Sequence, residues 1–269
     1  MSAPARLRAI VAVTAVAAAA VVAGVVYATR QDPPQPKVLC KKPAVQVVPG
    51  VGSPYLQAVR DAFEKSPKSA ARALEALADR HPKDPVVQYN NATALLCAGY
   101  VADATAAYRQ AKKAGRNTYY EVRADNLLHP EFFGPGYPIF QYAGKDPLLI
   151  QGQFAQRQFH QHTAELLYAK AARLHPDDAD AQVAAAVGRF DMDDLNASFS
   201  RLGPLVKRFP DSQTVRFHLG WLLAWTGQGN LAVKEFKEAR RLGAATALGK
   251  EADAFLKRLE SSGTHSTQR

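Results

Sequence analysis

The sequence predicts an all-α fold, an α-solenoid of helix-turn-helix repeats preceded by an N-terminal membrane-directed helix. Two observations predict this fold. An apolar run without any charged side chain occupies residues 9–27. Behind it, a register of 34 residues starts at residues 51, 85, 145, 179 and 213. Because each repeat buries its apolar face only against its neighbours, we expect the repeats to stack into one helical array.

The register is defined by side-chain size. Its eighth position holds Ala58, Ala92, Gly152, Ala186 and Gly220, and its twentieth holds Ala70, Ala104, Ala164, Ser198 and Ala232. Its twenty-fourth position holds Leu74, Tyr108, Tyr168, Leu202 and Phe236, and its thirty-second holds Pro82, Pro176 and Pro210 in three units. Small residues let two helices approach closely, large apolar residues fill the space between units, and proline ends the second helix.

This pattern resembles the tetratricopeptide repeat family, whose units are two antiparallel helices packed through small residues at positions eight and twenty. The last unit matches best, at Leu219, Gly220, Leu223, Gly227, Ala232, Phe236 and Ala239. Gly99 and Gly227 share the position before the second helix, where a residue free to take positive φ helps the turn. The chain looks like bacterial membrane-anchored members of this family, which implies a scaffold that binds another polypeptide and carries out no catalysis.

The predicted organisation follows from the register. The segments are an anchor or signal at 1–30, a Pro-rich linker at 31–52, a pair of repeats at 53–118, an irregular insertion at 119–144, three contiguous repeats at 145–246, a capping helix at 247–261 and a disordered tail at 262–269. The linker, with Pro33, Pro34 and Pro36, favours extended chain that could hold the repeats away from a membrane.

The apolar run at residues 9–27 is long enough, at about 1.5 Å per residue, to span a hydrocarbon core of about 30 Å. We favour a single-pass anchor in the cell membrane. A secretory signal cleaved near Ala28 is the alternative, because Val26-Tyr27-Ala28 is an acceptable cleavage signature. Basic residues flank both ends of the run, so charge leaves the orientation open. We expect the bulk of the chain outside the cytoplasm, since export signals begin with a basic patch followed by an apolar run.

The two cysteines, Cys40 and Cys97, leave two alternatives open. They form one disulfide in an oxidising compartment, or Cys97 packs in a helix as a small hydrophobe while Cys40 stays in the linker. The sequence does not decide between these alternatives.

The insertion contains prolines and glycines that exclude regular helix over residues 129–142, although residues 118–128 can be helical. It also contains the aromatic residues Phe132, Phe133, Tyr137 and Phe140. Two interpretations stay open. The rings plug the seam between the two sets of repeats, or the loop lies in or beside the concave groove and takes part in ligand capture or autoinhibition.

The resemblance implies a protein-binding groove on the concave face, lined by the first helix of each unit. Carried over to this sequence, its residues are Tyr89, Leu96, Leu149, Arg157, Val183, Phe190, Phe217, Trp221 and Trp225. This lining predicts an apolar or aromatic segment as the ligand, with Arg157 as an anchor for an acidic group. The alternative for Trp221 and Trp225 is packing against the capping helix or the insertion.

Other chemistries find little support. About half of the net charge of +10 lies in the first fifty residues, and we find no basic stripe with interleaved aromatics, so we expect no nucleic-acid partner. His160 and His162 point to different helix faces, and residues 191–194 suggest a solvated helix cap instead of a calcium loop. Without a phosphate loop or nucleophile elbow, we expect no enzyme, metal, cofactor or small-molecule substrate.

The predicted function is therefore a membrane-tethered scaffold that binds a protein or peptide partner. We expect this scaffold to act in the assembly or chaperoning of envelope complexes. Two alternatives remain. One is an assembly factor of the cytochrome c maturation type. The other is a regulatory or enzymatic subunit with the aromatic loop as a lid.

Overall fold

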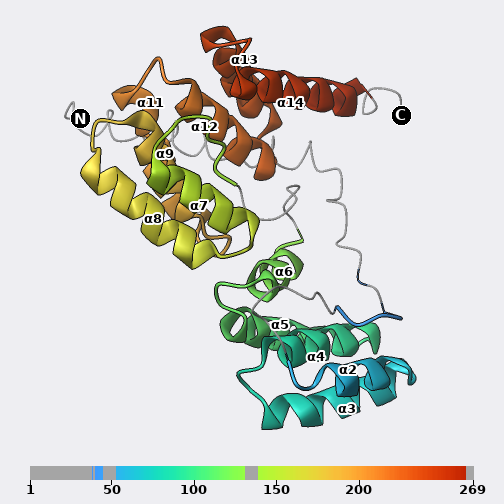
Figure 1. The fold of residues 1–269 in the computed structure, drawn as a ribbon. Helices are drawn as coiled ribbons and strands as arrows, with labels where there is room; N and C mark the ends of the chain where they lie inside the picture. Colours follow the sequence, from blue (N-terminus) through green and yellow to red (C-terminus); the bar gives the residue numbers. More distant parts are fainter. Residues whose placement is uncertain (1–37, 39, 45–52, 131–138, 265–269) are drawn as a thin grey trace, which may run out of the picture.

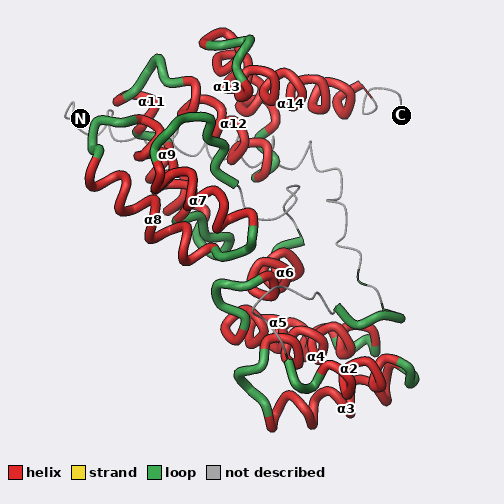
Figure 2. Tube along the Cα trace, in the orientation of Figure 1, coloured by secondary structure: helices red, strands yellow, loops and turns green. Residues whose placement is uncertain are grey.

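The computed structural model describes residue 38 and residues 40–44, 53–130 and 139–264. Over these residues the secondary structure is helical and contains no strand (Figure 2). The helices form two groups, and each group has a hydrophobic core of its own (Figure 1). We call the group α2–α6 with residues 40–44 the N-terminal module, and the group α7–α14 with residues 139–142 the C-terminal module. The all-α prediction is confirmed for this part of the chain.

The N-terminal module consists of α2 (Leu56–Phe63), α3 (Pro67–Arg80), α4 (Pro85–Cys97), α5 (Val101–Ala114) and α6 (Tyr119–Leu128). Local sequence explains where these helices begin. Ser66 and Asp84 accept main-chain N–H groups in the first turns of α3 and α4, and proline follows each of them at the first helical position. The helix expected over residues 118–128 is observed as α6, which ends before the prolines of the insertion.

The C-terminal module consists of α7 (Pro147–Arg157), α8 (Gln161–Leu174), α9 (Ala179–Gly188), α10 (Leu195–Leu202), α11 (Leu205–Arg208), α12 (Gln213–Trp225), α13 (Gly229–Leu242) and α14 (Ala247–Thr264). The second helix of the fourth unit is split into α10 and α11, because Pro204 lacks the N–H that a continuous helix requires. The capping helix α14 extends three residues beyond its predicted end at residue 261.

The contact between positions eight and twenty-four explains the small residues of the register. A Cβ atom added to Gly152 would collide with the ring of Tyr168, and one added to Gly220 would lie 3.0 Å from the ring of Phe236. Both rings are fully buried. The two helices of a unit therefore approach as closely as the sequence pattern requires.

The turn between the two helices of a unit needs positive φ. Gly99 and Gly227 take φ values of 87° and 78°. The third unit has Phe159 at the same register position, with φ of 66°. This conformation costs a side-chain-bearing residue about 1–2 kcal/mol. The ring of Phe159 packs edge-on against Tyr119, with ring centroids 5.2 Å apart, so a contact between the two modules holds the strained turn.

A disulfide joins Cys40 and Cys97, whose Cα atoms are 5.5 Å apart. This settles the alternative that the sequence left open. The bridge links residues 40–44 to Cys97 at the end of α4. Ala44 packs against the core of the N-terminal module.

Some predictions concern residues outside the described part of the chain. The apolar run at 9–27, the rings of Phe132, Phe133 and Tyr137, and the last five residues of the predicted tail all belong there. Within the described residues, no helix combines the length and the apolar character needed to cross a bilayer.

Candidate functional site: two occupied grooves

The predicted groove residues are mostly covered. Tyr89, Leu149, Val183, Phe190, Phe217, Trp221 and Trp225 each expose 9% or less of their surface, Leu96 is half-buried and Arg157 is exposed. Their role in binding stays a prediction. The question for the site is which parts of the chain cover them.

The two tryptophans pack inside the C-terminal module. The ring of Trp221 lies 6.3 Å from that of Phe255 on α14, and Trp225 meets Phe190 edge-on at 4.9 Å. Phe255 also contacts Phe217 at 6.2 Å. The capping helix therefore covers this end of the predicted lining, which favours the packing alternative for Trp221.

Residues 139–142 contact α7, α8 and α12 of the C-terminal module, and we call them the C-terminal strap. Phe140 is fully buried. Its ring lies 5.4 Å from Tyr168 on α8, 5.1 Å from His218 on α12 and 5.7 Å from Tyr142, on which it stacks. Phe140 thus belongs to the hydrophobic core of the C-terminal module, and the choice between a plug of the seam and a role in ligand capture stays a prediction.

Side chains of α7 bind the main chain of the C-terminal strap. The N–H of Phe140 donates to Oε1 of Gln156 at 2.9 Å, and Nε2 of Gln153 donates to the carbonyl oxygen of Phe140 at 2.9 Å. Oε1 of Gln156 also accepts the hydroxyl of Tyr168 at 3.0 Å. Both polar main-chain groups of Phe140 therefore have hydrogen-bond partners inside the protein. Burial of this extended chain thus avoids the free-energy cost of unpaired polar groups.

His218 binds the next residue of the strap. The N–H of Gln141 donates to Nε2 of His218 at 3.0 Å, while Nδ1 lies 2.8 Å from the carbonyl oxygen of Thr214. A carbonyl only accepts, so these contacts assign the proton to Nδ1 and leave Nε2 as the acceptor. Burial lowers the pKa of His218 from 6.5 to about 4, so the ring is neutral at pH 7.

Residues 40–44 occupy the N-terminal module in the same manner, and we call them the N-terminal strap. The N–H of Ala44 donates to Oδ1 of Asn90 at 2.8 Å, and Nδ2 of Asn90 lies 3.2 Å from the carbonyl oxygen of Ala44. Nδ2 also donates to the carbonyl oxygen of Val86 at 2.8 Å. The hydroxyl of Tyr120 donates to the Ala44 carbonyl at 3.4 Å.

Asn90 and His218 stand at the same register position, the sixth of their units. Each is almost fully buried. Each donates to the carbonyl oxygen four residues earlier in its own helix and accepts a main-chain N–H from a strap. The two modules therefore bind extended main chain by one device. Sequence reasoning missed it because the family pattern directs attention to other positions, although a polar residue at position six of the second and fifth units was the available signal.

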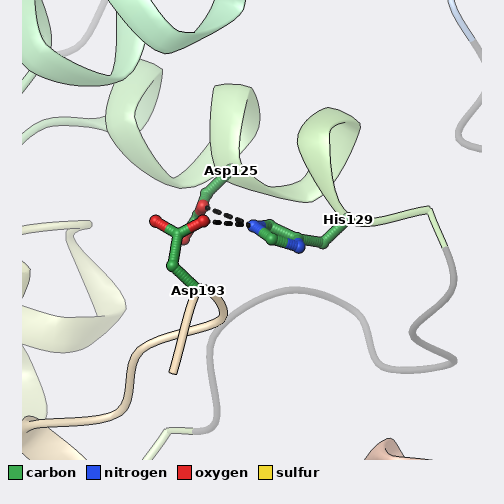
Figure 3. Close-up of side chains that lie close together, drawn as sticks. All are labelled: Asp125, His129 and Asp193. Atoms are coloured by element: carbon green, nitrogen blue, oxygen red, sulfur yellow. Dashed lines mark hydrogen bonds and ion pairs between the residues drawn. The ribbon is translucent and has the colours of Figure 1, made fainter. Parts of the chain in front are cut away.

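A third cluster joins the modules (Figure 3). Nε2 of His129 lies 2.9 Å from Asp193 and 3.7 Å from Asp125, and these three residues are close enough to share a metal ion. However, Nζ of Lys112 lies 2.7 Å from Asp125 and 2.9 Å from Asp193. The ammonium of Lys112 already pairs with both carboxylates, so the geometry describes an ion-pair cluster between the modules.

The electrostatics agree with this description. The hydrogen bond from Lys112 lowers the pKa of Asp193, and the nearby His129 acts in the same direction. Burial alone would lower the pKa of Lys112, but its bonds to Asp125 and Asp193 raise it on balance. The expected helix cap in this segment is Asp194, which accepts the N–H of Ala197 at 2.9 Å, whereas Asp193 belongs to the cluster.

No family model matches this chain, and no curated protein matches it. Among solved structures, it is similar to MamA 41-end from Desulfovibrio magneticus RS-1, with 17% identity over 72% of this chain and 95% of that chain, at a TM-score of 0.29. It is also similar to the TPR2AB domain of yeast Sti1 in complex with pHSP90, with 13% identity over 77% and 94% of the two chains, at a TM-score of 0.35. Likenesses this weak carry no argument, so the repeat architecture rests on the register and contacts described above.

Proposed function

We propose that this chain is a scaffold, tethered to a membrane, that binds an extended apolar or aromatic segment of another polypeptide. The observation that carries the proposal is the C-terminal groove, where Gln153, Gln156 and His218 bind the main chain of residues 139–142. Groups that bind main chain accept other sequences in the same conformation, while the apolar surroundings of Phe140 select for an aromatic side chain.

The location is part of the proposal. The disulfide between Cys40 and Cys97 supports an oxidising compartment, because glutathione and thioredoxin keep cytosolic thiols reduced. An apolar run at residues 9–27 behind Arg6 and Arg8 supports export with retention in the membrane. Together they favour an extracytoplasmic scaffold that acts in the assembly or chaperoning of envelope complexes.

A cavity of about 10 Å³ beside the C-terminal strap bears on the alternative function. Its lining is mostly apolar, with Ala186, Val187, Phe190, Trp221 and Leu222. Such a volume holds about one water molecule. In the described part of the chain, this cavity therefore gives no support to an active site beneath an aromatic lid.

The test is site-specific photocrosslinking in the native host with a tagged full-length chain. A photoreactive residue replaces Gln153, which reaches the strap, or the control Leu166, which is 58% exposed on α8. We expect envelope proteins crosslinked through an apolar or aromatic segment at position 153 only. Identical partners at both positions, or partners at position 166 alone, would contradict groove binding.

The tether has a separate test. The full-length chain should stay in the membrane fraction after alkaline extraction, while a chain lacking residues 1–30 should be extracted. Release of the full-length chain would contradict the anchor and support a cleaved signal.

A further inference from the structure

We infer that residues 139–142, Ile-Phe-Gln-Tyr, occupy the C-terminal groove as a stand-in for the partner. The inferred partner segment is extended and carries two aromatic residues separated by one residue of any kind. It enters the groove by displacing the C-terminal strap. This inference rests on the proposed function, and it specifies both the chemistry of the partner and the control of the site.

The first aromatic position is defined by Phe140. Its ring is enclosed by the rings of Tyr168, His218 and Tyr142 at 5.1–5.7 Å, and none of its surface is exposed. Full burial of such a side chain contributes about 2–3 kcal/mol, and aromatic contacts add about 0.5–1.5 kcal/mol per pair. A partner with a small or charged residue here would leave the site empty or place a charge among rings.

The second aromatic position is defined by Tyr142. It stacks on Phe140 with an interplanar angle of 20°, and its hydroxyl accepts the N–H of Asp146 at 3.0 Å. Its ring remains partly exposed. A second aromatic residue therefore adds to binding, but less than the first.

The residue between them is bound through its main chain. The hydrogen bond that the structure shows for Gln141 uses its N–H, which donates to His218. Together with the N–H and carbonyl of Phe140, three main-chain groups of the strap are bound by side chains of α7 and α12. An extended partner presents the same three groups whatever its middle side chain is, so this position carries little specificity.

Part of the packing in the C-terminal module does not involve the C-terminal strap, and on our inference this packing keeps the module folded when the strap leaves the groove. The packing of Tyr168 over Gly152 and of Phe236 over Gly220 joins the helices within the units without using the strap. The strap is held by hydrogen bonds and ring contacts. As part of the same chain, it competes at an effective concentration of about millimolar, so a weak or unsuitable segment does not displace it.

The test uses a fluorescent peptide with the sequence of residues 139–146, Ile-Phe-Gln-Tyr-Ala-Gly-Lys-Asp, and measures its binding to the full-length chain by anisotropy. We expect Phe140→Ala in the chain to increase its affinity for this peptide at least about tenfold over the wild type, because the strap no longer fills the groove. A peptide with Ala in place of its own Phe should lose this binding. Equal affinities of the folded variant and the wild type would overturn the inference.

Two further variants serve as a second strap variant and as a control on the groove. Gln141→Pro removes the N–H that donates to His218 but keeps the ring of Phe140, and it should also increase peptide affinity; it decides the outcome if Phe140→Ala does not fold. Gln153→Ala, combined with either strap variant, should weaken the peptide again, since Gln153 donates to the strap carbonyl. The fluorescence of Trp221 and Trp225 checks that α12 remains packed.

The inference and the proposed function can fail separately. Partners crosslinked at position 153, with no peptide binding to either strap variant, would overturn the stand-in role and leave the scaffold standing. Peptide binding to the strap variants, with partners only at position 166, would uphold the exchangeable groove but contradict its use in the cell.

Discussion

Both modules bind their straps through a buried polar side chain at position six of the register. Only the N-terminal strap is also fixed by a disulfide. In the N-terminal module, Asn90 binds Ala44, and the disulfide from Cys40 to Cys97 closes the attachment. In the C-terminal module, His218 binds Gln141 through one hydrogen bond, and the disulfide lies in the other module. Position six of the register thus binds extended main chain in the second and fifth units.

The difference between a covalent and a hydrogen-bonded attachment indicates which strap a partner can displace. A covalent bridge makes residues 40–44 part of the fold under oxidising conditions, so that groove is permanently filled. The strap at 139–142 is held by contacts that a partner of the same shape can replace one for one. We therefore propose that the N-terminal strap serves structural stability and that the C-terminal strap marks the site of partner recognition.

The largest expected effect comes from reducing the disulfide. The bridge joins residues 57 apart in sequence, and a loop of that length corresponds to about 4 kcal/mol of chain entropy. A reductant, or Cys97→Ser, should therefore lower the urea midpoint of the N-terminal module. Both tryptophans lie in α12, so their fluorescence follows the C-terminal module alone. The far-UV signal should develop an early transition that fluorescence does not show, whereas equal shifts of both would contradict independent modules.

The next effect concerns the cluster between the modules. Asp125 is fully buried, and Lys112→Met leaves its carboxylate without the ammonium, which should cost about 3 kcal/mol in the free energy of unfolding. Asp193 is 63% exposed, so Asp193→Asn should cost less than about 1 kcal/mol. Chemical denaturation followed by far-UV circular dichroism measures both. A larger loss for Asp193→Asn than for Lys112→Met would show that the junction is organised differently.

The stability of the two modules should depend differently on pH. The pKa of His218 is depressed from 6.5 to about 4 by burial, so the unfolded chain binds a proton first as pH falls. The stabilisation is complete above about pH 6.5, and up to about 3 kcal/mol is lost as pH falls towards 4. Asn90 does not titrate, so the N-terminal strap should lack this dependence.

A matched variant isolates the histidine in that experiment. His218→Gln keeps an acceptor for the strap but does not titrate, so its fluorescence-detected urea midpoint should fall less between pH 7 and pH 4. Burial raises the pKa of Asp180, whose carboxyl bonds to Thr214, and this change has the opposite sign. It is present in both proteins and cancels in the difference. Parallel pH profiles would contradict the role given to His218.

A smaller effect than that of Lys112→Met is expected at Asn90. Asn90→Ala removes both hydrogen bonds to Ala44, and the unpaired main-chain groups should cost about 2 kcal/mol in the reduced protein. With the bridge intact the loss should be smaller, because the strap stays near its site. A double-mutant cycle with Cys97→Ser measures this coupling. Strict additivity would mean that the bridge and Asn90 do not hold the same segment.

Most of the fold was predictable because packing rules leave a trace in sequence. Gly152 and Gly220 are small since the rings of Tyr168 and Phe236 lie directly above them. The helix beginning at residue 119 was also expected. The positive φ of Phe159 was not, because the pattern favours glycine at this position and the ring contact with Tyr119 depends on a residue distant in sequence.

The site was less predictable, because it depends on contacts between distant residues. The bond from Lys112 to Asp193 joins residues 81 apart, and that between Gln141 and His218 joins residues 77 apart. The burial of Phe140 was expected from its chemistry, but the sequence left open whether it plugs the seam or takes part in ligand capture. The disulfide was undecided because spacing along the chain does not show which cysteines meet in space.

Native-state hydrogen exchange at single-residue resolution tests the central claim most directly. In the oxidised wild-type protein, the account predicts that the N–H of Gln141 exchanges at least about tenfold faster than the core amides of α12, because the C-terminal strap opens alone. The N–H of Ala44 should be protected as well as the core of α4 until the disulfide is reduced. Exchange of Gln141 only at the rate of the α12 core would mean that the strap leaves only when the module unfolds, and would contradict an exchangeable groove.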